Sequence, residues 1–356
     1  MRGEPDHLFA RDGSNDRRGL RSGSGTRGRP RGPDFGAGSF ALEGKMRRLF
    51  ALAVVALFLA GCANAESQAD GLRVENCGST EVFPEPPKRV VSLNQHATEI
   101  LLALGLGDRL VGTAYPDDLA PPASVAAAYA GVPLLADQYP SYERILETEP
   151  DLVVGGYSSA FDDTEGRSRK TFEDNGIRTL LLSESCAASP AGMDTLLSDI
   201  AMFGEVLGLQ ENARQVAAGI EQRVRAVAER LAGAEPVDVF VYDSGEQAAF
   251  TLGGNGVGHD ALRRAGGRNV FGDVPEVFAD VSWEQVAARA PRAIVLVDYL
   301  AAPVQNKQAY LAGHPLASGT PAVREQRFST IPLVELTEGI RFPDAVERLA
   351  RDLHGA

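Results

Sequence analysis

The sequence predicts an α/β protein of two lobes, and three observations lead to this prediction. Short runs of β-branched and apolar residues alternate with helical stretches, as in parallel sheets with crossover helices. At 356 residues the chain is long enough for about two domains of ordinary size. A stretch from 193 to 234 has almost no strand signal and separates two groups of predicted strands. We therefore expect two Rossmann-like lobes with mainly parallel sheets, over 87–192 and 235–356.

The first lobe is expected to contain a parallel sheet. Apolar runs place its strands at 89–93, 110–113, 152–154 and 179–182, and helices begin near Ala97, Ser141 and Ser168. The helix after the first strand carries its apolar residues on one face. It ends at Gly105, a residue type that favours helix ends.

The second lobe repeats this pattern after a helical connection. Its strands are expected at 237–242, 293–297 and 328–331, with helices near Asp260, Trp283, Lys307 and Pro343. In the connection, apolar residues from Ala213 to Leu231 recur on one helical face. A helix over 211–231 spans about 31 Å. We therefore expect a long rigid helix within 193–234 to bridge the lobes, with a ligand cleft between them.

The first 61 residues fit neither lobe. Residues 1–45 are rich in Arg, Gly and Pro without an apolar period, so they are either a disordered extension or an over-called upstream start. From Met46, two arginines precede a twelve-residue apolar run, which is too short to cross a hydrocarbon core of about 30 Å. Residues 46–61 therefore have the pattern of a secretory signal peptide.

The end of this signal places Leu59, Ala60 and Gly61 directly before Cys62. This arrangement resembles the lipobox of bacterial lipoproteins, in which small residues precede a cysteine. The resemblance implies cleavage before Cys62 and attachment of lipid to its sulfur, followed by an N-terminal tether over 62–86. The alternative is an ordinary signal peptide with an incidental cysteine.

The two other cysteines, Cys77 and Cys186, form an even pair in a chain that we expect to be exported. Because such compartments favour disulfides, we expect Cys77 and Cys186 to be bonded, with two unpaired thiols as the alternative. Isolated cysteines and scattered histidines lack the spacing of a zinc site, so we expect no bound metal. The net charge of −13 lies mostly after residue 61 and argues against nucleic acid as a partner.

A series of motifs runs through both lobes in a fixed order. They are PKRVVSL (87–93), TEILLALG (98–105), PSYERI (140–145), EPDLVV (149–154), GGRNVF (266–271), VSWEQV (281–286) and APRAIV (290–295). The series resembles the cluster A-II (class III) substrate-binding proteins of ABC importers, which carry ferric siderophores, cobalamin or haem. The segment NQHATE (94–99) also resembles a branch of importers for a deazaflavin precursor.

This resemblance implies a lipid-anchored monomer on the extracytoplasmic face of the membrane. Such a protein captures its ligand and delivers it to an ABC permease dimer with a cytoplasmic ATPase. The resemblance also implies one docking glutamate for permease arginines at the tip of each lobe, which are Glu143 and Glu284 by motif. Both glutamates also fall near a predicted helix start, where the helix dipole favours a carboxylate in any protein.

The candidate ligand site lies in the loops beyond the carboxyl ends of the strands, where open parallel sheets bind ligands. Aromatic side chains with polar tips gather there, and an arginine near the start of the last helix suits an anion. The candidate residues are Asn94, Gln95, His96, Tyr115, Tyr139, Tyr157, Ser158, Phe161, Tyr242, Tyr299 and Arg341. His96 is either a ligand to haem iron or a ring that only hydrogen-bonds a ligand or the backbone.

Two other classes of protein stand as alternatives, a secreted enzyme and a structural surface lipoprotein. The sequence contains no G-x-S-x-G, P-loop or H-E-x-x-H motif, which lowers the weight of the enzyme. A structural lipoprotein would show no ligand-dependent change, and the two-lobed layout argues against it. We expect a binding protein with no catalytic residues and no resident cofactor.

Overall fold

The computed structural model describes residues 71–117, 120–186, 190–299 and 303–355. The predicted extension, the signal peptide and Cys62 lie outside these residues. Among the described residues, no helix combines the length and the hydrophobicity that a membrane crossing requires.

The N-terminal lobe is built on a five-stranded sheet, all parallel, in the order β5-β4-β3-β6-β7. The chain fills the β4 and β5 side first and then returns to β6 and β7, so the strand order reverses beside β3. Such a switch point opens a crevice at the carboxyl ends of the strands. The strands are β3 (Val90–Ser92), β4 (Leu110–Ala114), β5 (Leu134–Ala136), β6 (Leu152–Gly155) and β7 (Arg178–Leu181).

The helices of this lobe connect successive parallel strands. The apolar runs of β3 and β6 are fully buried because helices cover both faces of a parallel sheet. The helices and 3-10 turns are α2 (Gln95–Ala103), η1 (Gly107–Arg109), α3 (Ala126–Tyr129), α4 (Tyr142–Leu146), η2 (Ser158–Phe161), α5 (Arg169–Asp174) and η3 (Ser183–Cys186).

The C-terminal lobe contains a mixed sheet in the order β11-β9-β8-β12-β13, and β10 also pairs with β8. β10, β12 and β13 continue the parallel pattern, whereas β9 and β11 are antiparallel. The strands are β8 (Val237–Ser244), β9 (Ala249–Leu252), β10 (Gly267–Asn269), β11 (Phe278–Val281), β12 (Ala293–Asp298) and β13 (Phe328–Pro332). The helices and turns are α8 (Val257–Arg264), α9 (Trp283–Arg289), α10 (Val304–Gly313), η4 (Ala317–Gly319), α11 (Pro321–Arg324), η5 (Leu333–Glu335) and α12 (Phe342–His354).

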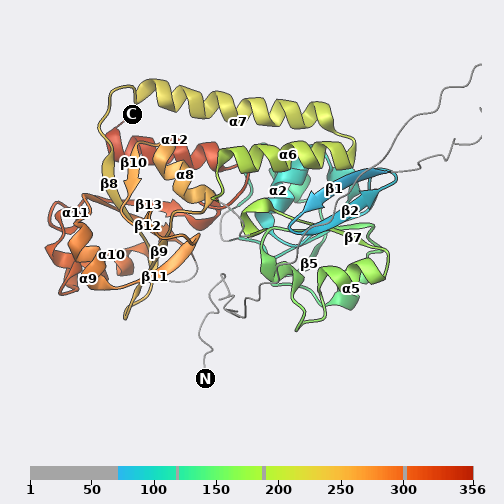
Figure 1. Cartoon of the computed structure of the whole chain (residues 1–356), viewed down its shortest axis with the longest axis horizontal. Helices are drawn as coiled ribbons and strands as arrows, with labels where there is room; N and C mark the ends of the chain where they lie inside the picture. The colour runs from blue at the N-terminus through green and yellow to red at the C-terminus, as the bar shows by residue number, and fades with distance from the viewer. Residues whose placement is uncertain (1–70, 118–119, 187–189, 300–302, 356) are drawn as a thin grey trace, which may run out of the picture. The chain divides into compact units, whose positions relative to one another are not determined.

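Two consecutive helices connect the lobes, α6 (Met193–Leu207) and α7 (Gln210–Arg230). Gly208, in the left-handed conformation, ends α6. Figure 1 shows α7 lying along α6 and α12. Asn212 of α7 donates to Leu104 O of the N-terminal lobe at 2.9 Å, and Arg223 pairs with Glu347 of α12 at 2.7 Å. The connection is therefore fixed to both lobes.

The segment predicted as a simple tether up to residue 86 contains a hairpin, β1 (Leu72–Asn76) and β2 (Ser79–Phe83). Its two turn residues, Cys77 and Gly78, both have positive φ, as a tight type I′ turn requires. The sequence prediction missed the hairpin because neither strand alternates clearly. The hairpin attaches to the N-terminal lobe through a disulfide between Cys77 and Cys186, whose Cα atoms lie 5.0 Å apart.

A continuous core passes from one lobe to the other. One cluster of buried apolar residues includes Leu101 of α2, Phe203 of α6, Val224 of α7 and Val346 of α12. Since apolar burial is the main stabilising term in folding, the lobes are not independent folding units.

Candidate functional site

The candidate site is a group of aromatic side chains beyond the carboxyl ends of strands from both sheets. His96 follows β3 and packs on Tyr157, which follows β6, with ring centroids 4.6 Å apart. Tyr115, after β4, packs on Tyr139 at 4.7 Å. Tyr299 follows β12 in the C-terminal lobe and hydrogen-bonds Tyr115. We call these five residues, which come from both lobes, the aromatic cluster.

Asn94 supports the aromatic cluster through the hydrogen bonds of its side-chain amide. Its Oδ1 accepts a hydrogen bond from Gly156 N at 2.8 Å, and its Nδ2 donates to the Tyr139 hydroxyl at 3.1 Å. The same hydroxyl also lies 3.0 Å from Ser159 Oγ. Asn94 is almost fully buried and its amide is occupied by these partners. In the structure, Asn94 therefore holds neighbouring residues of the site in place and does not present its amide to a ligand.

His96 is buried and neutral. Burial lowers its pKa to about 4, although a hydrogen bond with the Gly156 backbone acts in the opposite direction. A Cβ at Gly156 would lie 2.1 Å from His96 Nε2, so only glycine allows this approach. His96 Nδ1 is buried without a hydrogen-bond partner among the described residues. An unsatisfied buried nitrogen is costly, and a bound ligand could remove that cost.

Three tyrosines of the cluster, Tyr115, Tyr139 and Tyr157, remain phenols at neutral pH. Burial raises the pKa of Tyr139 and of Tyr115, and it raises the pKa of Tyr157 well above the ordinary value. Protonated hydroxyls can both donate and accept hydrogen bonds. The cluster therefore offers flat apolar faces with polar tips to a large ligand.

Tyr115 has a strained backbone, with φ of 54°. A bulky residue rarely adopts this left-handed conformation, which costs of the order of 1–3 kcal/mol and tends to be retained at functional sites. The conformation allows the Tyr115 ring to contact Tyr139 while its hydroxyl bonds Tyr299 of the other lobe.

Arg167 was missed by the sequence analysis because no motif marks it. Its guanidinium carbon lies 5.0 Å from the centroid of the Tyr139 ring, and it donates to Ala160 O at 2.7 Å. The residue is only 5% exposed, and none of the ion pairs between described residues includes it. Buried charges are nearly always paired, so a site beside Tyr139 favours a ligand with anionic groups.

Gln95 and Arg341, both predicted to bind ligand, belong instead to a buried network between the lobes. Arg341 precedes α12 and makes two hydrogen bonds to Glu99 of α2, at 2.8 and 2.6 Å. Gln95 donates to the same carboxylate at 2.9 Å. Arg341 also donates to Ala120 O at 2.7 Å. The anion that meets Arg341 is therefore a side chain of the other lobe, and we do not carry Arg341 into the candidate site.

Three other predicted residues are not part of the aromatic cluster. Phe161 packs on Phe172 inside the N-terminal lobe. Tyr242 lies in the core of the C-terminal lobe and stacks on Tyr310, because β8 is buried on both faces and alternation cannot tell which face a side chain takes. Ser158 is exposed at the start of η2.

The two predicted docking residues are both exposed, one on each lobe. Glu143 stands in the first turn of α4, where hydrogen bonds from its own backbone N–H and from Ser141 lower its pKa. Glu284 stands in the first turn of α9, after a capping box formed by Ser282 and Gln285. These positions agree with either role of the two carboxylates, helix-end stabilisation or docking.

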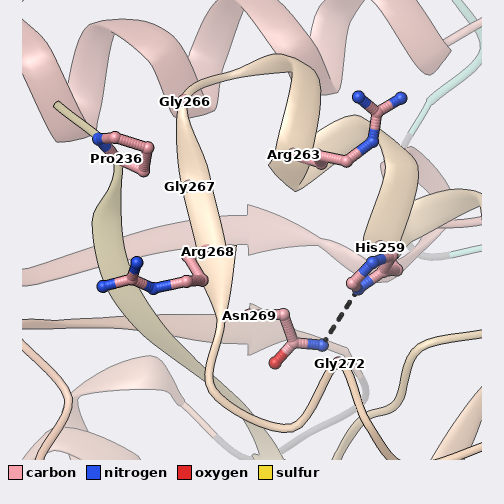
Figure 2. Close-up of a pocket in the computed structure, with 8 residues that line it drawn as sticks. All are labelled: Pro236, His259, Arg263, Gly266, Gly267, Arg268, Asn269 and Gly272. Carbon is pink, nitrogen blue, oxygen red and sulfur yellow. Dashed lines mark hydrogen bonds between the residues drawn. The ribbon is translucent and has the colours of Figure 1, made fainter. Parts of the chain in front are cut away.

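A separate pocket of about 420 Å³ lies on the C-terminal lobe between the end of α8 and β10. Figure 2 shows His259 and Asn269 pointing toward one another there, with Nδ1 and Nδ2 3.4 Å apart. Its arginines are already paired, Arg263 with Asp260 and Arg268 with Asp238. With its charges internally compensated, this pocket is a weaker candidate than the aromatic cluster. In the part of the chain that the structure describes, no group of three or more His, Cys, Asp or Glu could hold a metal ion.

Comparison with known proteins gives relatives over most of the chain. The substrate-binding lipoprotein YvrC of Bacillus subtilis, an ABC transporter component by name, is 27% identical over 85% of this chain and 95% of its own length. The vitamin B12-binding protein of Yersinia pestis is 29% identical over 59% of this chain and 69% of its own.

Solved structures agree with these relatives. A periplasmic binding protein from Veillonella parvula superposes with a TM-score of 0.73 at 29% identity, covering 80% of this chain and 98% of its own. A protein of an ABC-type Fe3+-hydroxamate transport system from Saccharomonospora viridis gives 0.68 at 25% identity, covering 80% and 99%. The family model described as periplasmic binding protein matches residues 90–333. These residues include both sheets and the connecting helices, and the chain therefore belongs to the periplasmic binding protein family.

Proposed function

We propose that this protein is the extracytoplasmic substrate-binding component of an ABC importer. It captures a large chelate or cofactor, such as a ferric siderophore, cobalamin or haem, and presents it to a permease. The observation that carries the proposal is the aromatic cluster, in which both lobes contribute side chains beyond the carboxyl ends of their strands. Two similar proteins are named for ligands of this kind, the vitamin B12-binding protein among the sequence relatives and the Fe3+-hydroxamate transport protein among the solved structures.

The chemistry of the cluster supports an anionic ligand with extended flat surfaces. Phenol hydroxyls can donate to chelate oxygens, and tyrosine and histidine rings can cover a macrocycle or an aromatic chelator. Arg167 supplies a positive charge that interacts with Asp162 electrostatically but forms no direct ion pair among the described residues. This combination fits a carboxylate-bearing or hydroxamate-bearing chelate better than a neutral sugar.

Attachment to the membrane is part of the same proposal and rests on the sequence around Cys62. Lipid on Cys62 would keep the protein close to its permease. A Cys62→Ser variant should leave the membrane fraction or remain unprocessed. A variant that stays membrane-bound with an unchanged mature mass would contradict the anchor.

The experiment that tests the proposed function is calorimetric titration with ferric hydroxamate siderophores, cobalamin, haem and deazaflavins. Tryptophan fluorescence is a poor reporter because Trp283 is buried in the core of the C-terminal lobe. At least one ligand should saturate at one molecule per chain. Tyr115→Ala should weaken that binding at least tenfold, because it removes a ring that joins the lobes.

The matched control is Tyr310→Ala, which removes a tyrosine outside the aromatic cluster whose hydroxyl bonds Glu246 O at 2.9 Å. Its affinity should equal that of the wild type. If none of the ligands binds, or if the two variants lose affinity equally, the aromatic cluster is not the site. Turnover of a ligand by the wild type would favour an enzyme.

A further inference from the structure

Glu184 and Glu338 connect the two lobes, each through the backbone of the other. Glu184 lies in η3 of the N-terminal lobe, and its N–H donates to Glu338 Oε2 at 2.8 Å. Glu338 follows η5 of the C-terminal lobe, and its N–H donates to Glu184 Oε2 at 3.0 Å. The two bonds close a ring between segments 154 positions apart in sequence. We call this pair the carboxylate clasp.

Neighbouring elements complete the carboxylate clasp. Val257 N, at the start of α8, donates to Glu184 Oε1 at 2.7 Å. Asp199 of α6 accepts hydrogen bonds from Ser183 N at 2.7 Å and Ser183 Oγ at 2.6 Å, directly before Glu184. The disulfide of Cys186 also fixes η3 from its other end. Both lobes and the connecting helix therefore meet at this point.

We propose that the carboxylate clasp is a proton-dependent latch between the lobes. It holds them together most strongly in mildly acidic solution and loosens as the pH rises through neutrality. This inference goes beyond the proposed function and does not depend on which ligand the protein binds.

The geometry requires a proton because three carboxyl groups meet without a cation. Glu338 is 1% exposed and Asp199 is 3% exposed, and none of the ion pairs between described residues includes either of them or Glu184. No N–H or hydroxyl group of the described residues donates to the buried Glu338 Oε1, and the Glu338 side chain shares a hydrogen bond with the Asp199 carboxyl group, which needs a proton on one of the two. Adjacent buried carboxyls cannot all ionise cheaply.

The pKa values of all three carboxyl groups are raised, as the geometry leads one to expect. Burial, followed by the charges of Asp199 and Glu184, raises the pKa of Glu338 well above its ordinary value. Burial of the Glu184 carboxylate raises its pKa to about 7, although the N–H groups of Val257 and Glu338 act in the opposite direction. Burial also raises the pKa of Asp199.

Other charged groups on the surrounding elements are compensated or neutral. On α8, Asp260 pairs with Arg264 at 2.7 Å, and the pKa of His259 is lowered by burial. Beside Glu338, Glu335 pairs with Arg348 and Arg341 pairs with Glu99. From the aromatic cluster, Tyr157 interacts with the charge of Glu184, and burial raises the pKa of its phenol well above the ordinary value.

The sign follows from proton linkage. In an opened clasp the carboxyls are hydrated and titrate near their ordinary pKa of about 4.3. The closed clasp has raised pKa values, so it binds more protons, and the advantage that Glu184 contributes decreases as the pH rises from about 4.3 through about 7. Glu184 alone should increase the opening constant about tenfold between pH 6 and pH 8.

Hydrogen exchange of the ligand-free protein tests the proposal. The probes are the backbone amides of Glu184, Val257 and Glu338, each a donor in the clasp, measured at pH 6 and pH 8. Rates are converted to protection factors, which removes the intrinsic pH dependence of exchange. Protection at these amides should fall about tenfold or more between pH 6 and pH 8. Amides of the central strand β8 should change much less.

Two variants separate the clasp from general effects of pH. In Glu184→Gln/Glu338→Gln neither group can ionise, so protection should be nearly equal at the two pH values. Glu347→Gln removes a carboxylate on α12 that pairs with Arg223 of α7 and is not a member of the clasp. This variant should keep the wild-type dependence of protection on pH. Equal wild-type protection at pH 6 and pH 8 overturns the proposal, as does a full response in the double glutamine variant. Should the double variant not fold, the wild-type series and Glu338→Gln decide the question.

Discussion

At the scale of single residues, the structure separates side chains that support the site from those that can meet a ligand. Asn94 and Gln95 were predicted to face ligand, yet their amides are occupied by Tyr139, Gly156 and Glu99. The sequence could place these residues at the carboxyl end of a strand. It could not show their partners, because those partners come from distant parts of the chain.

Arg341 illustrates why such partners are invisible in a sequence. Its anion, Glu99, lies 242 positions earlier. The position of Arg341 beside the start of the last helix predicted that it meets an anion, and it does. That anion is a glutamate of the other lobe, whereas the prediction was a bound ligand. Only the packing of the lobes shows that the anion is already present.

The first prediction concerns this buried ion pair between Arg341 and Glu99. Arg341→Met should destabilise the protein by about 3–5 kcal/mol, because Glu99 would remain buried without its cation. Arg341→Met/Glu99→Leu should recover much of that loss, since no unpaired charge remains. Urea unfolding of the variants measures both changes. A single variant as stable as the wild type would show that the pair contributes nothing to the union of the lobes.

At the scale of elements, the buried parallel strands were predictable and the antiparallel ones were not. β3, β6, β8 and β12 coincide with short, mostly apolar runs, as strands buried on both faces should. β9 and β11 were missed because AFTL and FADV are short and carry polar residues. They pair only through local antiparallel geometry, which periodicity over four residues cannot identify.

The hairpin β1–β2 is the element that depends most on a covalent bond. It reaches the N-terminal lobe through the disulfide and through Asn76, whose amide makes two hydrogen bonds to the backbone of Leu181, both within 2.9 Å. These bonds imitate one further step of strand pairing beside β7. The sequence contained the two cysteines and left open whether they were bonded.

The second prediction concerns the hairpin disulfide. Cys77→Ser/Cys186→Ser should lower the free energy of unfolding by up to about 4–5 kcal/mol, since the bond closes a loop of 109 positions. Thermal unfolding with and without reductant measures the effect, and reductant should change only the wild type. If reductant leaves the wild-type melting temperature unchanged, the bond is absent or makes no contribution to stability.

At the scale of the whole molecule, the predicted architecture of two α/β lobes and a bridging helix is present, and the ligand remains unidentified. The order of motifs along the chain carried the family resemblance, and the family model confirms it. The union of the lobes by a shared core, the Glu99–Arg341 pair and the carboxylate clasp had no signal in the sequence.

The third prediction concerns docking to a permease. Glu143→Ala/Glu284→Ala should leave ligand affinity unchanged and reduce uptake by cells at least tenfold, because the two exposed carboxylates would no longer meet a basic partner surface. Glu173→Ala/Glu276→Ala, which removes an exposed charge on α5 and another on the C-terminal lobe, should transport normally. Wild-type uptake by the first variant, at normal expression, would leave the two glutamates with only their helix-end role.

The connecting helix α7 affects how a permease could distinguish a ligand-loaded molecule from an empty one. Because α7 is fixed to both lobes, by Asn212 at one end and by Arg223 toward the other, the spacing between Glu143 and Glu284 should be nearly constant. The distance between Glu143 and Glu284 would then be the same in the loaded and the empty protein, so the permease could not use it to recognise bound ligand. The permease would instead distinguish the loaded protein by the ordering of a few side chains at the site. The lifetime of the complex between the two proteins is the other quantity that could differ. Spin labels at 143 and 284 should give the same distance distribution with and without ligand.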